Sequence, residues 1–195
     1  GDALSAWDEV ATRYQRAGRD REAIQVFEKM VEIDGANPLP RVRLAEALCR
    51  VQDLDRAVTT FWSAAELLIE GGRGDDALKV IERILHFRQD PQYARAAAEL
   101  YLKRGTREDA LQSLARLQIC FQANPKDLDT LALLAQAFVR IDAEAKAIEV
   151  YKEMARIARE LGRRDVFDNL MAHLRTIAPH DEQVAALEDR KSTRL

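Results

Sequence analysis

Residues 7–38 read WDEVATRYQRAGRDREAIQVFEKMVEIDGANP. Large aromatic side chains alternate in this stretch with small alanines at helical spacing, a pattern that lets two helices pack closely. Gly18 lies in the middle, where it can end a helix without strain. Asn37 and Pro38 close the stretch, because a residue that precedes proline is driven out of the helical region. The segment therefore predicts a pair of helices joined by a short turn.

The same pattern returns at a fixed interval, which is the mark of a repeat protein. Ala23, at the opening of the second helix, recurs 34 residues later as Ala57. This period and the residues at the key positions resemble the tetratricopeptide repeat (TPR) family. Those positions are Trp7, Val10, Ala11, Tyr14, Gly18, Ala23, Phe27 and Pro38. The resemblance implies antiparallel helix pairs that stack into an α-solenoid and bind other proteins.

A longer repeat is superimposed on the first. The sequence RVRLAEALCRVQDLDRA at residues 41–57 aligns without gaps to LALLAQAFVRIDAEAKA at residues 131–147, an offset of 90 residues. Upstream of this stretch the offset is 87, so three residues are inserted between the two alignments. We therefore predict two five-helix modules, at residues 1–90 and 91–180, and a short capping helix with a disordered tail at residues 181–195.

One helix in each module is expected to serve two helix pairs. A third repeat can be followed from Phe61 to Pro91, but its opening Ala77 follows Ala57 by only 20 residues. One long helix must therefore close the second repeat and open the third. In all we expect an all-α protein with about eleven helices, near residues 3–17, 20–34, 39–52, 54–71, 75–88, 91–104, 107–122, 127–141, 143–162, 164–178 and 181–190.

The composition suits long helices and excludes several classes of protein. Of the 195 residues, 47% are hydrophobic and 32% are charged, with only 8 Gly and 5 Pro. The net charge of −3 is too balanced for a general nucleic-acid or membrane-surface binder. Cys49 and Cys120 lie in apolar helical patterns, which indicates buried reduced thiols rather than a disulfide. Because no run of about 18 apolar residues or leader segment is found, we expect no membrane insertion and a cytoplasmic location.

No catalytic or metal-binding constellation is found, so we expect no enzymatic activity, no cofactor and no metal. His86, His173 and His180 occur singly, without the spacing that a zinc site needs. The glycine cluster at residues 71–74 lacks the Lys-Ser or Lys-Thr that follows in a phosphate-binding loop.

Apolar residues of the first module occupy positions where solenoids usually carry polar contacts. We predict that Leu39, Val42, Trp62 and Ile69 contact a partner. Trp62 is the most informative of them, because Phe61 already fills the packing position beside it. An exposed tryptophan would be a binding hot spot. The alternative is that the shared helix buries both faces and Trp62 belongs to the core.

The corresponding positions of the second module become basic. Five cations on the long helix and on nearby first helices are predicted to contact an acidic partner: Arg95, Arg140, Lys152, Arg156 and Arg159. The matching stretch of the first module carries acidic residues, and a duplicated scaffold does not itself require such a difference. Ordinary solvation, with internal pairs such as Glu153 with Arg156, is the alternative explanation.

Three functions are compatible with these patterns. The leading hypothesis is a scaffold or adaptor that presents a groove to another protein, either a helix, a peptide or a folded domain. The architecture resembles TPR segments of bacterial motility, polarity and envelope-assembly proteins, which would make a small GTPase or a pilus component the partner. The alternative is a nucleic-acid-binding module that uses the basic long helix, although no aromatic residues interleave there for base stacking. The third is a self-assembly module or a regulatory cover, and for the chain itself we expect a monomer or a weak dimer.

Overall fold

The computed structural model describes residues 2–189 and the side chains of residues 4–188. This described part contains eleven α-helices and no β-strand. The helices are α1 (Asp2–Arg16), α2 (Asp20–Ile33), α3 (Pro38–Arg50), α4 (Leu54–Glu70), α5 (Gly74–Phe87), α6 (Pro91–Arg104), α7 (Arg107–Ala123), α8 (Leu128–Arg140), α9 (Glu144–Glu160), α10 (Arg164–Ile177) and α11 (Glu182–Asp189). Each lies within two residues of its predicted position, so the all-α class is confirmed. Residues 190–195, for which we predict a disordered tail, lie outside the described range.

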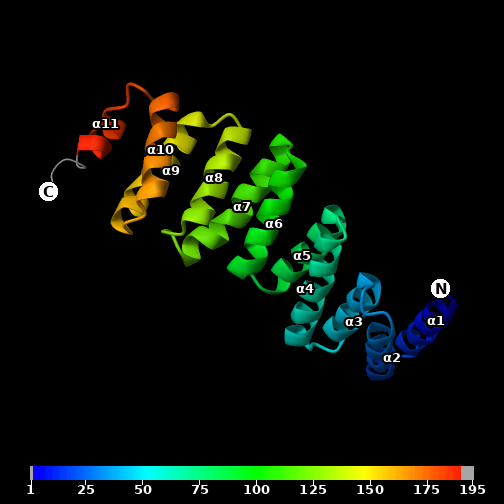
Figure 1. Cartoon of the computed structure of the whole chain (residues 1–195). Helices are drawn as coiled ribbons and strands as arrows, with labels where there is room; N and C mark the ends of the chain where they lie inside the picture. The colour runs from blue at the N-terminus through cyan, green and yellow to red at the C-terminus, as the bar shows by residue number, and fades with distance from the viewer. Residues whose placement is uncertain (1, 190–195) are drawn as a thin grey trace. The chain divides into compact units, whose positions relative to one another are not determined.

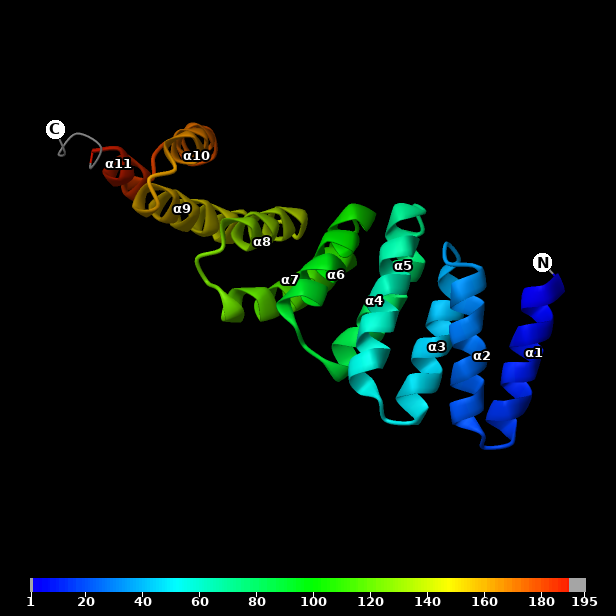
Figure 2. The same cartoon turned by 60° about the horizontal axis from the view of Figure 1, so that its bottom comes forward.

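The helices form two compact units, Gly1–Gln89 and Asp90–Leu195. In the first unit, α1 to α5 pack in chain order, each against the next. Figure 1 labels these helices, and Figure 2 shows α1 and α2 running antiparallel beside each other. In the second unit, α6 to α10 follow the same order, and α11 packs against both α9 and α10. Antiparallel neighbours joined by short turns are the TPR-type pairs that the repeats predict.

The predicted turn residues begin and end the helices. The side chain of Asn37 caps α3 by accepting a hydrogen bond of 3.0 Å from the backbone N–H two residues on, with Pro38 in the first turn. Asp90 and Pro91 play the same parts at the start of α6. Gly18 follows α1 with a φ of +73°, a left-handed conformation that glycine adopts without a Cβ clash. The helix ends are therefore determined by local sequence.

The helix α4 serves two pairs, as the shortened repeat predicts. It packs against both α3 and α5, and its Ala57, Phe61 and Leu68 are buried. The equivalent helix of the second unit is α9, which packs against α8 and α10 and buries Ala155 and Ala158. Small residues at these positions allow the backbones of three helices to approach closely.

The two cysteines differ in environment. Both are free thiols, but Cys120 is buried whereas Cys49 is partly exposed, so the prediction of a buried thiol is wrong for Cys49. Burial raises the pKa of both thiols above the ordinary value. Both thiols are therefore protonated at neutral pH. In the part of the chain that the structure describes, no helix has the length and apolar content needed to cross a membrane.

Candidate functional site

A hollow of about 250 Å³ opens in the first unit where α3, α4 and α5 meet. We call it the α3–α5 groove. The residues that line it are Pro38, Leu39, Val42, Leu68, Arg73, Asp76, Lys79, Val80 and Arg83. Apolar side chains come from all three helices, and charged side chains come from α5 and the residue before it. The hollow thus combines an apolar floor with a charged rim.

The floor of the α3–α5 groove is built from two buried and two accessible side chains. Leu68 and Val80 belong to the core. Val42 is partly exposed, and Leu39 is 59% exposed in the first turn of α3. An isolated exposed leucine needs no explanation. Leu39, however, continues an apolar surface that runs down into the hollow, which makes it a candidate contact for an apolar ligand group.

The rim of the α3–α5 groove carries more positive than negative charge. Arg73 and Lys79 both donate to Asp76, at 2.7 Å and 3.3 Å. Hydrogen bonds from Arg73 and then from Lys79 lower the pKa of Asp76, so it stays ionised at neutral pH. Arg83 forms an ion pair across to Glu46 on α3. The long side chains of Arg73 and Lys79 remain largely exposed, which leaves their charges accessible to an acidic ligand.

The four residues predicted in the first module are only partly brought together. Leu39 and Val42 line the α3–α5 groove. Ile69 is exposed on α4 beside the groove residue Leu68, but it does not line the hollow. Trp62, two turns earlier on α4, is partly buried and does not line the hollow either. It is therefore neither the fully exposed indole nor the core residue that the sequence left as alternatives.

The basic series of the second module contains a buried lysine. Lys152 is only 2% exposed, and its Nζ contacts Glu149 Oε1 at 2.5 Å, Asp181 Oδ2 at 3.0 Å and Gln183 Oε1 at 3.1 Å. Burial by itself would lower the pKa of Lys152, but the carboxylates of Glu149 and Asp181 outweigh it and raise the pKa. The expectation of an exposed Lys152 is corrected, because the N-terminal end of α11 covers its ammonium group.

The other predicted cations also have contacts within the second unit. Arg95 pairs with Asp127 and donates to Thr130 Oγ1 at 2.8 Å, which anchors the N-terminal end of α8. The remaining three also have contacts: Arg140 donates to Gly105 O at 3.3 Å, Arg156 to Glu153 at 2.8 Å, and Arg159 to Leu187 O at 3.2 Å. These contacts do not combine the five cations into one surface. The Glu153 to Arg156 pair is the internal pair that the sequence offered as an alternative.

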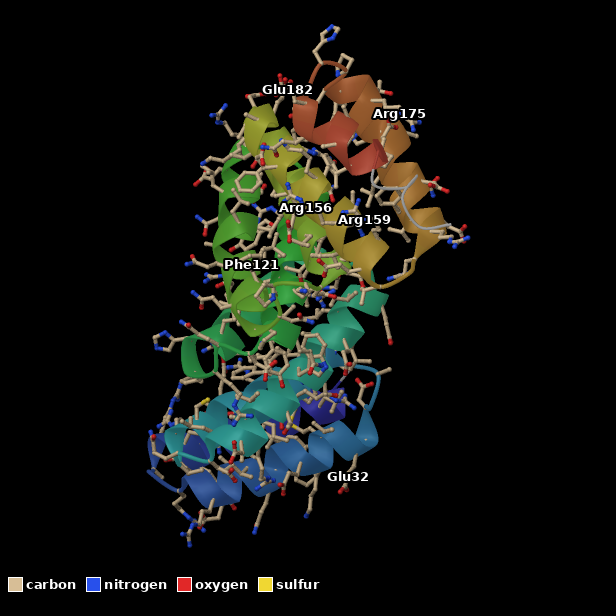
Figure 3. The ribbon with its side chains drawn as sticks, turned by 90° about the vertical axis from the view of Figure 1, so that its left-hand side faces the viewer. Glu32, Phe121, Arg156, Arg159, Arg175 and Glu182 are labelled. Carbon is tan, nitrogen blue, oxygen red and sulfur yellow. The ribbon has the colours of Figure 1, made fainter. Side chains whose placement is uncertain are left out.

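Sequence reasoning missed an apolar hollow of about 360 Å³ in the second unit. Its lining contains one polar residue among seven: Leu114, Gln118, Phe121, Leu131, Leu134, Phe138 and Val150. Phe121, labelled on α7 in Figure 3, is 40% exposed. Comparing the two modules could have revealed this hollow. The first module has Asp34, Arg41 and Thr60 at the positions that Phe121, Leu131 and Val150 occupy in the second.

These observations define a class of protein. The described residues form TPR-type antiparallel helix pairs, in which one helix of each unit is shared, and the predicted fold class is confirmed. No family model matches the chain. A TPR repeat-containing protein, MJ1428 of Methanocaldococcus jannaschii, is 20% identical over 196 residues that cover 88% of this chain and 34% of that protein. The chain thus spans about a third of that relative's length. The match is to a TPR protein, as the repeat pattern predicts.

Solved structures are similar to this chain at low sequence identity. MamA (41-end) of Desulfovibrio magneticus RS-1 is 20% identical with a TM-score of 0.45, covering 82% of this chain and 97% of that chain. YrrB, described as a TPR protein with an unusual peptide-binding site, is 11% identical with a TM-score of 0.43, covering 94% and 90%. At these levels of similarity neither structure bears on the function of this chain.

Proposed function

We propose that this chain is a protein-binding scaffold and that the α3–α5 groove holds a segment of another protein. The observation that carries the proposal is the exposure of Leu39 in the apolar floor of a hollow whose rim is charged. A hollow of about 250 Å³ has room for one bulky apolar side chain. Burying such a side chain contributes about 1.5–3 kcal/mol. One anchor of this size gives weak binding, so neighbouring contacts must add to it.

The charges of the rim indicate which neighbouring contacts are possible. Three cations, Arg73, Lys79 and Arg83, line the groove together with one carboxylate, Asp76. Arg73 and Lys79 contact Asp76, whereas Arg83 pairs with Glu46. A ligand that places a carboxylate beside its apolar anchor would meet a cation without displacing the existing ion pairs, because Lys79 is mostly exposed. The groove therefore suits a peptide or helix with an apolar residue next to acidic ones. The pathway, a cytoplasmic location and a small GTPase as partner stay predictions from the sequence.

The nucleic-acid alternative has less support from the geometry. It required the basic long helix α9 to offer its cations to phosphates. Lys152 is buried, Arg156 pairs with Glu153, and Arg159 donates to the backbone of α11. If nucleic acid were the ligand, binding should weaken steeply as salt is added. A steep loss of bound nucleic acid between low and moderate salt would favour this alternative, and no retention at low salt would end it.

Selection from a random peptide library on the full chain tests the α3–α5 groove. We expect enriched peptides to carry a bulky apolar residue beside acidic residues and to be lost from a Leu39→Asp variant. Ile33→Asp is the matched control, because Ile33 is 64% exposed on α2 and lies outside the groove. Far-UV CD verifies that both variants stay helical. Peptides that bind Leu39→Asp and wild type equally would show that the groove is not the site.

A further inference from the structure

The last helix, α11, covers a surface formed by α9 and α10. Its Val184 and Leu187 are buried in a core cluster that both of these helices supply. We call this surface the α9–α10 face, and its apolar members are Met154, Ile157, Phe167, Met171 and Leu174. Figure 3 labels Arg156 and Arg159 on α9, Arg175 on α10 and Glu182 in the first turn of α11, all in the same region of the second unit. The face is thus apolar in the middle and basic at its edges.

Opposite charges hold α11 at both of its ends. At the first end, Asp181 Oδ2 accepts from Lys152, while Asp181 Oδ1 accepts from the backbone N–H groups of residues 183 and 184 at 2.8 Å and 3.2 Å. At the other end, Arg175 pairs with Glu188, and Arg159 donates to Leu187 O. The cations belong to the α9–α10 face, and Asp181 and Glu188 belong to the segment that covers it. Lys152 also contacts Glu149 of its own helix at 2.5 Å.

The segment that covers the face is short and leaves a hollow beside it. α11 has 8 residues, and an isolated helix shorter than about 12 to 15 residues is at best marginally stable in water. Residues 178–181 join it to α10, and its Ala185 and Ala186 are exposed. A hollow of about 420 Å³ remains beside it, lined by Phe167, Asp168, Met171, Arg175 and Glu188. A longer helix could fill this space, which α11 leaves open.

We propose that the α9–α10 face is a docking site for an acidic amphipathic helix of a partner protein, and that α11 occupies it in cis until the partner displaces it. The chemistry of the partner follows from that of α11. The partner helix needs an acidic N-cap residue to pair with Lys152, as Asp181 does. It needs apolar residues three and six positions after that cap, as at Val184 and Leu187. An acidic residue must follow the second apolar one to pair with Arg175. This face belongs to the second unit and the α3–α5 groove to the first. Either proposal can therefore fail while the other holds.

A fluorescein-labelled peptide of residues 178–189 serves as the probe, and the full chain is its target. In wild type the peptide competes with α11, so its apparent affinity is the intrinsic affinity multiplied by the small fraction of chains in which α11 is undocked. Val184→Asp with Leu187→Asp releases α11, and we expect this variant to bind the peptide at least about tenfold more tightly. Ala185→Asp with Ala186→Asp is the matched control, which adds the same charges to the exposed side of α11 and should behave like wild type.

A second peptide tests the role of charge in the same site. Asp181→Asn keeps a good N-cap residue but removes the charge that pairs with Lys152. We expect this peptide to bind the released variant about tenfold more weakly than the natural sequence. Equal affinities for the two peptides would mean that Lys152 does not recognise the helix and would overturn the proposed recognition.

Other outcomes overturn the proposal as a whole. They are the absence of peptide binding by a released variant that keeps its helicity, and equal binding by wild type and the released variant. A concentration-dependent dimer of wild type that the release substitutions abolish would assign the face to α11 of a second copy instead. If the released variant loses its fold, the chain with Asp181→Asn and Glu188→Gln loosens α11 through its charges alone. That chain must then bind the peptide more tightly than wild type, and failure to do so overturns the proposal.

Discussion

Removing the side chain of Phe61 tests whether α4 holds two helix pairs together. The ring is 1% exposed in a helix that packs against both α3 and α5, and the guanidinium of Arg83 lies 5.4 Å from its centroid. Truncating a buried phenylalanine to alanine costs about 3–5 kcal/mol, including the cavity that remains. Loss of the partly exposed cation–π contact adds only about 0.5 kcal/mol. Phe61→Ala should therefore lower the free energy of unfolding of the first unit by about 3–5 kcal/mol.

The duplication supplies a matched control and the assay separates the two units. Tyr151 occupies the equivalent position of α9 but is only partly buried, edge-on to His173 with ring centroids 4.8 Å apart. Tyr151→Ala should cost about 1–2 kcal/mol, since less apolar surface is lost from the core. Both tryptophans, Trp7 and Trp62, lie in the first unit. Tryptophan fluorescence therefore follows that unit, while far-UV CD follows the helices of both.

Urea unfolding of each variant, followed by both signals, gives the two costs by linear extrapolation. The midpoint of the fluorescence transition should fall much further for Phe61→Ala than for Tyr151→Ala. Two results would refute the conclusion that α4 is packed from both sides through this ring. One is a loss of unfolding free energy below about 1 kcal/mol for Phe61→Ala. The other is an equal loss for the two variants.

Three further substitutions test the contacts and turns. Lys152→Met keeps the buried stem but removes the charge, so the free energy of unfolding should fall by about 1.5–3 kcal/mol at pH 7. Burial lowers the pKa of Lys152, but Glu149 and Asp181 raise it further. The charge thus stabilises the fold below the unfolded lysine pKa of about 10.4, and the difference from wild type should shrink as the pH rises through the folded pKa; a pH-independent difference would contradict this. Asn37→Ala removes the cap of α3 and should cost about 1 kcal/mol in urea unfolding, whereas an equal loss in Asn37→Asp would rule out capping as the cause. Gly105→Ala places a Cβ 3.0 Å from a neighbouring guanidinium at a φ of +85°, and should cost about 1–2 kcal/mol in thermal unfolding, which an unchanged midpoint would disprove.

The candidate site could be predicted from the sequence only in part. Leu39 and Val42 were recognisable because the repeat shows which positions of α3 the helix pair does not use for packing. Ile69 and Trp62 follow the same reasoning along α4, yet neither lines the α3–α5 groove, because helical periodicity does not show where neighbouring helices leave space. The hollow that contains Phe121 could have been found by comparing the two modules position by position, since an aspartate of the first becomes a phenylalanine in the second.

The sequence itself determined the positions and the order of the helices, and which helix of each unit two helix pairs share. These features depend on local chemistry: the 3.6-residue period, the caps, and the prolines and glycines between helices. Only the tertiary structure decided which of the basic and apolar side chains are accessible. Lys152 has the sequence context of a surface cation but is covered by Asp181 and Gln183, about thirty residues further along the chain. Periodicity shows which face of a helix a side chain occupies, and only the packing of distant segments determines what covers that face.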